Sequence, residues 1–160
     1  TSKYVRAEAL TPQSKQLSLK IVESAGHLFH SNQKYIQLVQ EGEADALGLI
    51  QQLNAGVLAI DEKTTRLLME NVDNLKMLVE KRIGIPMREN TEQRQILKGI
   101  LPRPVVVRSA ELIALAYEEG LLEESISNTK SSLEAALYSV KFNVCAVSEE
   151  EILQFLKQVK

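Results

Sequence analysis

The chain alternates short, fully apolar runs with longer stretches in which apolar residues recur every three or four positions. The runs VLAI at 57–60 and VVV at 105–107 are each bounded by a turn-forming residue on one side and a charged residue on the other. A short apolar run with such ends is typical of a buried strand in a parallel sheet. The segment GHLFH at 26–30 predicts a further short strand.

Helices are predicted where apolar residues follow helical spacing and end signals frame them. Pro12 is expected to stop or kink the first helix, and the segment Asn54-Ala55-Gly56 carries a C-cap signal that ends the helix before VLAI. Ser148 and Glu151 have the spacing of a capping box, and Ser109 is placed to cap the helix after VVV. The predicted helices cover residues 3–10, 17–22, 45–53, 68–82, 109–119, 129–141 and 148–159.

Short apolar strands that alternate with amphipathic helices predict an α/β fold with a parallel sheet. We expect a single domain over residues 1–160, with an insertion at about 84–103 and C-terminal helices at about 129–160. The insertion is polar and shows helical character only in its second half. In parallel sheets, sites lie beyond the carboxyl ends of the strands. Asp61 and Ser109 follow the two predicted parallel strands and therefore occupy that position.

Composition narrows the class of protein. Hydrophobic residues make up 44% and charged residues 25% of the chain, as in an ordinary globular domain. The net charge of -2 gives no overall attraction to nucleic acid, although a local basic patch would. Cys145 is the single cysteine, which excludes an intrachain disulfide and a cysteine-based zinc cluster. We expect a cytoplasmic protein, because neither a membrane-length apolar run nor a signal-peptide pattern occurs.

Acidic residues stand at two places around the strand 57–60. Glu43 and Asp45 begin the helix before it, and Asp61 and Glu62 follow it directly. Carboxylates at a helix start favour the helix dipole by about 0.3–1 kcal/mol, so all of these residues fit as ordinary caps. Carboxylates that converge at one edge of a sheet also supply the oxygen ligands that Mg²⁺ and Mn²⁺ prefer. The spacing alone leaves both interpretations open.

Three segments occur in an order that carries a family resemblance. They are GEADALGLIQQLNAGVLAIDEKTTRLLMEN at 42–71, RSAELIALAYEEGLL at 108–122 and LEAALYSVKFNVCAVSEEEILQFL at 133–156. The first joins a Gly-Glu helix start, an apolar strand and an acidic turn with a downstream arginine. The second opens a helix with a hydroxyl residue, and the third is a helical tail. Together they resemble the PIN-domain nucleases, in particular the prokaryotic subgroup related to toxin–antitoxin toxins.

The resemblance implies a three-layer α/β/α sandwich with a short central parallel sheet and a helical C-terminal tail. Its acidic edge would bind Mg²⁺ or Mn²⁺ and hydrolyse single-stranded RNA, since a bound metal lowers the pKa of a water molecule that attacks the phosphodiester. The implied catalytic residues are Glu43, Asp61, Glu62 and Ser109. The implied metal ligands are Glu8, Glu43, Asp45 and Asp61.

The resemblance also implies partners. An RNA substrate needs cations along its backbone, and Arg66 and Arg108, together with Lys63 and Arg103, lie near the implied edge. A small antitoxin protein and a second copy of the chain in a homodimer are the protein partners that the family pattern implies. The scattered tyrosines and phenylalanines predict no base-stacking surface. His27 and His30 are expected on opposite faces of the strand 26–30, so they predict no metal pair.

One departure from the family pattern keeps an alternative function open. PIN domains begin with a central strand that ends in an aspartate, and the residues before Tyr4 are too few to form it. Either the sequence starts after that strand or the chain has lost that ligand. The alternative to an active nuclease is therefore a catalytically depleted binding or regulatory module on the same fold. An α/β scaffold in which every carboxylate is a helix cap is the third alternative.

Overall fold

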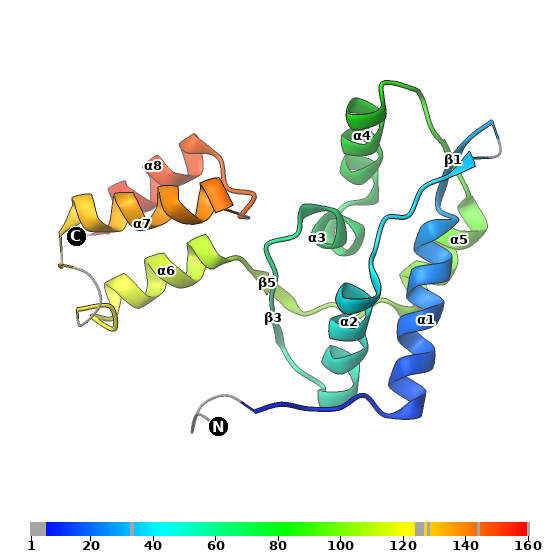
Figure 1. Cartoon of the computed structure of the whole chain (residues 1–160), viewed down its shortest axis with the longest axis horizontal. Coiled ribbons are helices and arrows are strands. Elements are labelled where there is room, and N and C mark those ends of the chain that lie inside the picture. The colour runs from blue at the N-terminus through cyan, green and yellow to red at the C-terminus, as the bar shows by residue number, and fades with distance from the viewer. Residues whose placement is uncertain (1–5, 33, 124–126, 128, 144, 160) are drawn as a thin grey trace. The chain divides into compact units, whose positions relative to one another are not determined.

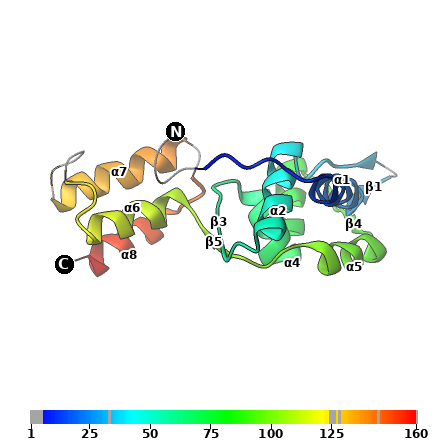
Figure 2. The ribbon, with the colours of Figure 1, turned by 90° about the horizontal axis from the view of Figure 1, so that it is seen from below.

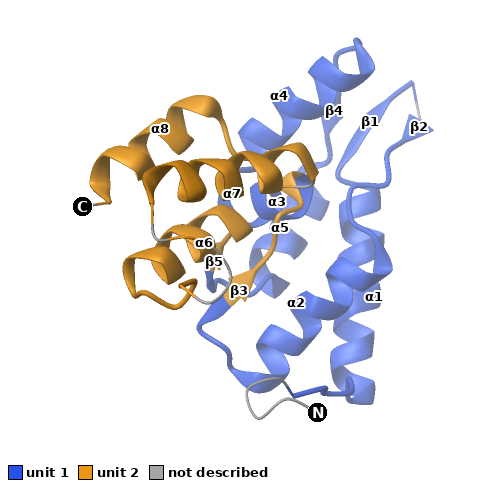
Figure 3. Ribbon diagram, turned by 60° about the vertical axis from the view of Figure 1, so that its left-hand side comes forward, with its two compact units in different colours: residues 1–57, 64–105 blue, residues 58–63, 106–160 orange. Residues whose placement is uncertain are grey.

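The computed structural model describes residues 6–32, 34–123, 127, 129–143 and 145–159, and it divides into two compact units. Unit 1 comprises Thr1–Val57 and Thr64–Val105, and unit 2 comprises Leu58–Lys63 and Val106–Lys160 (Figure 3). Over the described residues the fold is mixed α/β and mostly helical, with a small parallel sheet. The α/β class is thus as predicted. The prediction of one domain over the whole chain stays a prediction.

Unit 1 is built from helices and a small antiparallel sheet. Its elements are α1 (Pro12–Gly26), β1 (Phe29–Ser31), β2 (Lys34–Tyr35), α2 (Glu41–Leu53), α3 (Lys63–Glu70), α4 (Val72–Ile83), β4 (Arg88–Glu89) and α5 (Thr91–Ile100). The sheet has the strand order β2-β1-β4 with antiparallel pairing throughout. Helices α1 and α2 lie side by side (Figure 1). The fully buried side chains of this unit include Ile21, Leu28, Phe29, Val39, Leu47, Leu68, Leu75 and Leu97.

Gly48 permits the close packing of α2 on α1. A Cβ atom at this position would lie 2.6 Å from the Ser18 Oγ and 2.8 Å from the Ser14 carbonyl oxygen, and the latter is backbone that cannot swing away. The Ser18 hydroxyl already donates a 3.0 Å hydrogen bond to that carbonyl. The close approach of the two helices therefore depends on the missing side chain.

Gly48→Ala is expected to lower the free energy of unfolding by about 1–3 kcal/mol, because the added methyl overpacks the contact between α1 and α2. The matched change is Gly42→Ala in the same helix, where nothing lies within 4 Å of an added Cβ. That variant is expected to be as stable as the original protein or more stable by about 0.5 kcal/mol, because alanine favours helix. Urea denaturation followed by far-UV circular dichroism measures both. Equal effects of the two changes would show that the packing at Gly48 is looser than described.

Unit 2 contains the carboxyl ends of two parallel strands and three helices. The strands are β3 (Val57–Ala59) and β5 (Val105–Val107), and the helices are α6 (Ser109–Glu118), α7 (Lys130–Asn143) and α8 (Glu149–Gln158). The parallel pairing includes a 2.9 Å hydrogen bond from the Ile60 amide to the Val107 carbonyl. Figure 2 shows α6, α7 and α8 grouped together. Their shared core consists of Ala110, Leu133, Leu137, Cys145, Val147, Ile152 and Val159.

Several predicted helix boundaries differ from the structure. Residues 6–10 are not helical, and residues 3–5 of the predicted helix 3–10 lie outside the described residues. Pro12 does not stop a helix but stands at the first position of α1, where its missing N–H costs nothing. The helix predicted over 68–82 is two helices, because the Asn71 side chain accepts from the Asn74 amide and starts α4 anew.

Other predictions of local structure are confirmed or shifted by one residue. The strands at 57–60 and 105–107 are present as β3 and β5, although Val57 is exposed rather than buried. Asn54 ends α2 in the left-handed conformation, with φ 48°. Ser148 and Glu151 form the predicted capping box of α8. Ser109 is the first residue of α6 rather than its cap, and Arg108 occupies the capping position.

Candidate functional site

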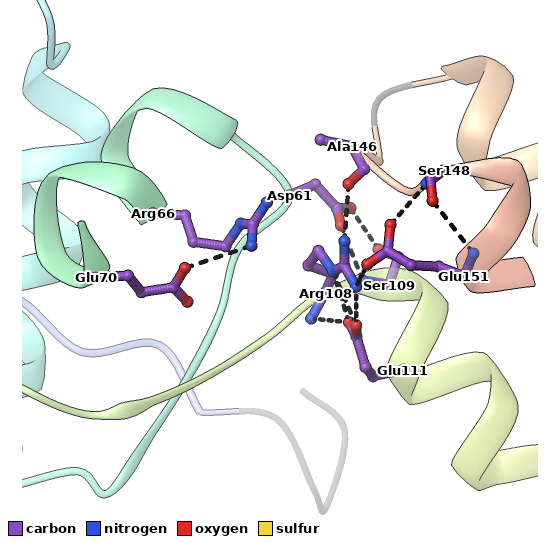
Figure 4. A network of polar contacts seen from close by, with 9 residues as sticks. All are labelled: Asp61, Arg66, Glu70, Arg108, Ser109, Glu111, Ala146, Ser148 and Glu151. Atoms are coloured by element: carbon purple, nitrogen blue, oxygen red, sulfur yellow. Dashed lines mark hydrogen bonds and ion pairs between the residues drawn. The ribbon is translucent and has the colours of Figure 1, made fainter. Parts of the chain in front are cut away.

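Asp61 and Ser109, which lie 48 residues apart, meet at the carboxyl ends of β3 and β5 (Figure 4). The Ser109 amide donates to the Asp61 Oδ1 at 2.8 Å, and the Ser109 hydroxyl donates to the Oδ2 at 2.5 Å. Parallel pairing of two strands brings their ends to one edge, which is why residues so distant in the chain come into contact. A carboxylate has about four lone-pair sites, so Asp61 can accept further contacts beside these two hydrogen bonds.

Asp61 is held in its ionised form. Burial opposes the charge, but it is outweighed by the hydrogen bonds from the Ser109 hydroxyl and amide and from the Cys145 thiol, and by the positive charge of Arg108. Together they lower the pKa of Asp61 below its usual value. Burial is the main cause of the raised pKa of Cys145, with the neighbouring Asp61 adding to it, so this thiol is a poor nucleophile.

Arg108 forms the centre of a polar cluster beside this pair (Figure 4). Its Nε and Nη2 donate to the Glu111 carboxylate, its Nη2 also donates to Glu151 at 2.7 Å, and its Nη1 donates to the Ala146 carbonyl at 2.8 Å. The Glu111 carboxylate in turn accepts from the Arg108 amide at 2.8 Å. One guanidinium thus connects the first turns of α6 and α8 with the segment that precedes α8.

The cluster is a buried cation with two partly exposed acidic partners. The side chain of Arg108 is 9% exposed, whereas those of Glu111 and Glu151 are 33% and 38% exposed. The hydrogen bonds to Glu111 are the main cause of the raised pKa of Arg108. Burial alone would raise the pKa of each glutamate, but the contacts with Arg108 lower both pKa values below the usual range. All three side chains are therefore charged at neutral pH.

Acid is expected to destabilise the protein through these carboxylates. Asp61, Glu111 and Glu151 have lowered pKa values in the folded protein, so the unfolded chain binds protons more readily. Their stabilising contribution is complete above the unfolded-state pKa values of about 4 and is lost as the pH falls through the lower folded-state values. The free energy of unfolding, measured by urea denaturation from neutral pH to strong acid, is expected to decrease as the pH falls below about 4. This decrease is expected to be smaller in Glu151→Gln than in the original protein. Equal pH dependence of the two proteins would contradict the assignment of the acid sensitivity to these carboxylates.

The other predicted metal ligands have local partners in unit 1. The Glu43 carboxylate accepts from the Gln40 amide at 2.7 Å and completes the capping box of α2. Both oxygens of Asp45 accept from the Lys15 ammonium at 2.9 Å, which ties α2 to α1. Glu8 forms an ion pair with Arg6 at 2.8 Å. Glu43, Asp45 and Glu8 belong to unit 1, whereas Asp61, Glu62 and Ser109 belong to unit 2.

The two predicted RNA-binding arginines have different surroundings. Arg66 forms a 3.4 Å ion pair with Glu70 one turn further along α3 (Figure 4). Arg108 donates from all three guanidinium nitrogens to protein groups, which is the environment of a structural cation. Arg108 is therefore held by protein groups rather than presented to a nucleic acid. The contact between Arg108 and Glu111 could have been predicted from the sequence, because Glu111 follows Arg108 at capping-box spacing.

Two aromatic contacts were missed by the sequence interpretation. The His27 ring lies 4.8 Å from the Tyr35 ring, and the His30 ring lies 5.6 Å from it. The prediction that His27 and His30 share a strand and face opposite ways was wrong, because His27 caps the end of α1 and only His30 is in β1. The sequence signal that could have indicated the β1–β2 hairpin, and with it the contact of His30 with Tyr35, is Asn32. This residue adopts a φ of 48° between the two strands.

Comparisons of the chain with protein-family models, with curated proteins and with solved structures found no match. Within the described ranges, no group of three or more His, Cys, Asp and Glu side chains is arranged to hold a metal ion. In the same part of the chain, none of the helices has the length and apolar character needed to cross a membrane.

Proposed function

We propose that the chain is a PIN-type, metal-dependent ribonuclease that hydrolyses single-stranded RNA. The observation that carries this proposal is the contact between Asp61 and Ser109. Asp61 is the acidic residue after one strand, and Ser109 is the hydroxyl residue after the other. The family resemblance implies that both residues lie at the metal site. The fold would be the three-layer α/β/α sandwich of that family, with β3 and β5 as part of its central sheet.

The roles of the residues follow from their chemistry. Asp61, ionised through its lowered pKa, is the proposed ligand for Mg²⁺ or Mn²⁺, with the lone-pair capacity that remains beside the hydrogen bonds from Ser109 and the Cys145 thiol. Ser109 fixes the orientation of that carboxylate by donating to both of its oxygens. The family resemblance assigns further ligand roles to Glu43, Asp45, Glu62 and Glu8, and the carboxylate that carries the proposal is that of Asp61. A metal bound there would supply charge for the phosphoryl oxygen and a more acidic water molecule.

A direct test uses a fluorescently labelled single-stranded RNA and the intact chain. Cleavage is expected in the presence of Mn²⁺ or Mg²⁺ and is expected to stop when EDTA removes the metal. Isothermal titration with Mn²⁺ alone gives a readout that does not depend on cleavage. A protein that neither binds Mn²⁺ nor cleaves RNA would overturn the proposal. A small antitoxin and a second copy of the chain are the proposed protein partners.

A second candidate function is a catalytically depleted binding module on the same fold. The observation that favours it is the engagement of two proposed ligands in local contacts: Asp45 with Lys15 at 2.9 Å and Glu43 with the Gln40 amide at 2.7 Å. Carboxylates with such partners lose a hydrogen bond or an ion pair when a metal competes for them. RNA binding that persists in Mn²⁺ without any cleavage would support this module over the nuclease.

A further inference from the structure

Three side chains form a row across one face of the antiparallel sheet β2-β1-β4. His30 is directly opposite Tyr35 on one side and directly opposite Arg88 on the other. Residues that are opposite each other in antiparallel strands point to the same face. The row therefore runs from a phenol ring through an imidazole to a guanidinium. Tyr35 is 51% exposed, and Arg88 is exposed as well.

The tyrosine ring has a fixed orientation although it is half exposed. The His27 ring meets it edge-on at 4.8 Å, with 68° between the ring planes, and the His30 ring lies tilted against it. The His27 imidazole is itself held, because its Nδ1 lies 2.8 Å from the Glu23 carbonyl oxygen. An exposed ring that is held in this way presents a flat apolar surface without losing much side-chain entropy on binding.

A hollow of about 350 Å³ lies beside this row in unit 1. It is lined by His30, Ser31, Asn32, Pro86, Met87 and Arg88. Its lining combines two apolar residues, Pro86 and Met87, with hydrogen-bonding groups and the Arg88 cation, and the Met87 amide donates to the Glu80 carboxylate at 2.9 Å. A cavity of this size falls within the range of small-molecule pockets and accommodates a nucleobase.

The row carries one exposed cation, Arg88. Lys34 is opposite Ser31 in the pairing of β1 with β2, so it points to the other face of the sheet. The acidic neighbour of Arg88 in β4 is Glu89, which is opposite Phe29 on the other face of the sheet. Its charge is compensated there by Arg94, whose Nη1 lies 3.0 Å from the carboxylate. Glu89 therefore does not neutralise Arg88 on the face that carries Tyr35.

We propose that this face of the sheet binds single-stranded RNA, with a base stacked on Tyr35 or inserted in the hollow and the phosphates contacting Arg88. Proteins that bind single-stranded nucleic acids combine aromatic side chains, on which bases stack, with cationic side chains that contact the phosphates. The positive charge of Arg88 favours an anionic ligand, and the tyrosine ring and the hollow favour a ligand with a flat apolar part. The choice of RNA over other polyanions rests on the proposed function.

The test measures binding of a fluorescein-labelled oligouridine to the intact chain by fluorescence anisotropy, in EDTA so that no cleavage occurs. Tyr35→Ala is expected to weaken binding roughly tenfold, as the loss of one base–aromatic stack does. Tyr35→Phe keeps the ring and is expected to bind like the original protein. Arg88→Met is expected to weaken binding and to reduce the slope of log K against log salt by about 0.7.

The matched controls are Phe142→Ala and Lys130→Met on α7, which remove an exposed ring and an exposed cation of unit 2. Both are expected to leave oligouridine binding unchanged. If Tyr35→Ala and Arg88→Met also bind as the original does, or if no oligouridine binds, the inference is overturned. Binding that depends on Tyr35 without any metal-dependent cleavage would overturn the proposed nuclease and leave this surface standing. Metal-dependent cleavage by a protein whose oligouridine binding is unchanged in Tyr35→Ala would overturn this surface and support the proposed nuclease.

Discussion

Arg108→Met is expected to lower the free energy of unfolding by about 2–3 kcal/mol. The change removes the cation but leaves its partners in place: the Glu111 carboxylate, the Glu151 carboxylate and the Ala146 carbonyl. Removing one member of a buried charge pair costs about 3–5 kcal/mol. The value is reduced here because solvent reaches the two glutamates, whose side chains are 33% and 38% exposed.

The measurement is urea denaturation of the variant beside that of Arg88→Met, which removes an exposed arginine of unit 1 and is expected to change stability by less than about 0.5 kcal/mol. Adding Glu151→Gln to Arg108→Met is expected to cost less than the sum of the two single changes, because the glutamate is already unpaired. Strict additivity, or a stability of Arg108→Met equal to that of the original protein, would show that the cluster contributes little to the fold.

Asp61→Asn is expected to reduce metal-dependent RNA cleavage by roughly 100-fold or more. The substitution removes the negative charge that the metal needs, and the amide oxygen can still accept the hydrogen bond from the Ser109 amide. The fold is therefore expected to survive while the affinity for Mn²⁺ falls. This separates the loss of a ligand from the loss of structure.

Cleavage rates and Mn²⁺ titrations of Asp61→Asn are compared with those of Asp73→Asn. Asp73 has a side chain that is 73% exposed on α4, and its replacement is expected to leave both quantities unchanged. Ser109→Ala is expected to lower cleavage less than Asp61→Asn, because it keeps the carboxylate and the backbone amide that orients it. Cleavage by Asp61→Asn at the original rate would remove Asp61 from the proposed site.

Sequence reasoning predicted those features of the fold that depend on neighbours in the chain. The capping box of Ser148 and Glu151, the left-handed Asn54 and the strand at 105–107 are all present. Each involves residues within about four positions of one another, so the local sequence is sufficient. The errors at Pro12 and Asn71 are also local, since both residues can start a helix as well as end one.

The candidate site was predicted in part. The position of Asp61 and Ser109 followed from the expectation that parallel strands end at one edge, and the two side chains do meet there. The polar cluster around Arg108 was not predicted, because Glu151 and Ala146 lie 43 and 38 residues further along the chain. The same arginine appeared from its position to be a candidate for RNA contact, and its burial could not be read from the sequence.

The sequence by itself determined the capping box of Ser148 and Glu151, the two apolar strands, and the expectation that Asp61 and Ser109 meet where those strands end. The tertiary structure alone decided that Arg108 is an internal cation and that Tyr35, His30 and Arg88 form one row. The physical reason is the range of the interactions. A cap is made by a backbone amide a few residues away. A buried ion cluster or a cross-strand row exists only after strand register and helix packing have brought distant residues together.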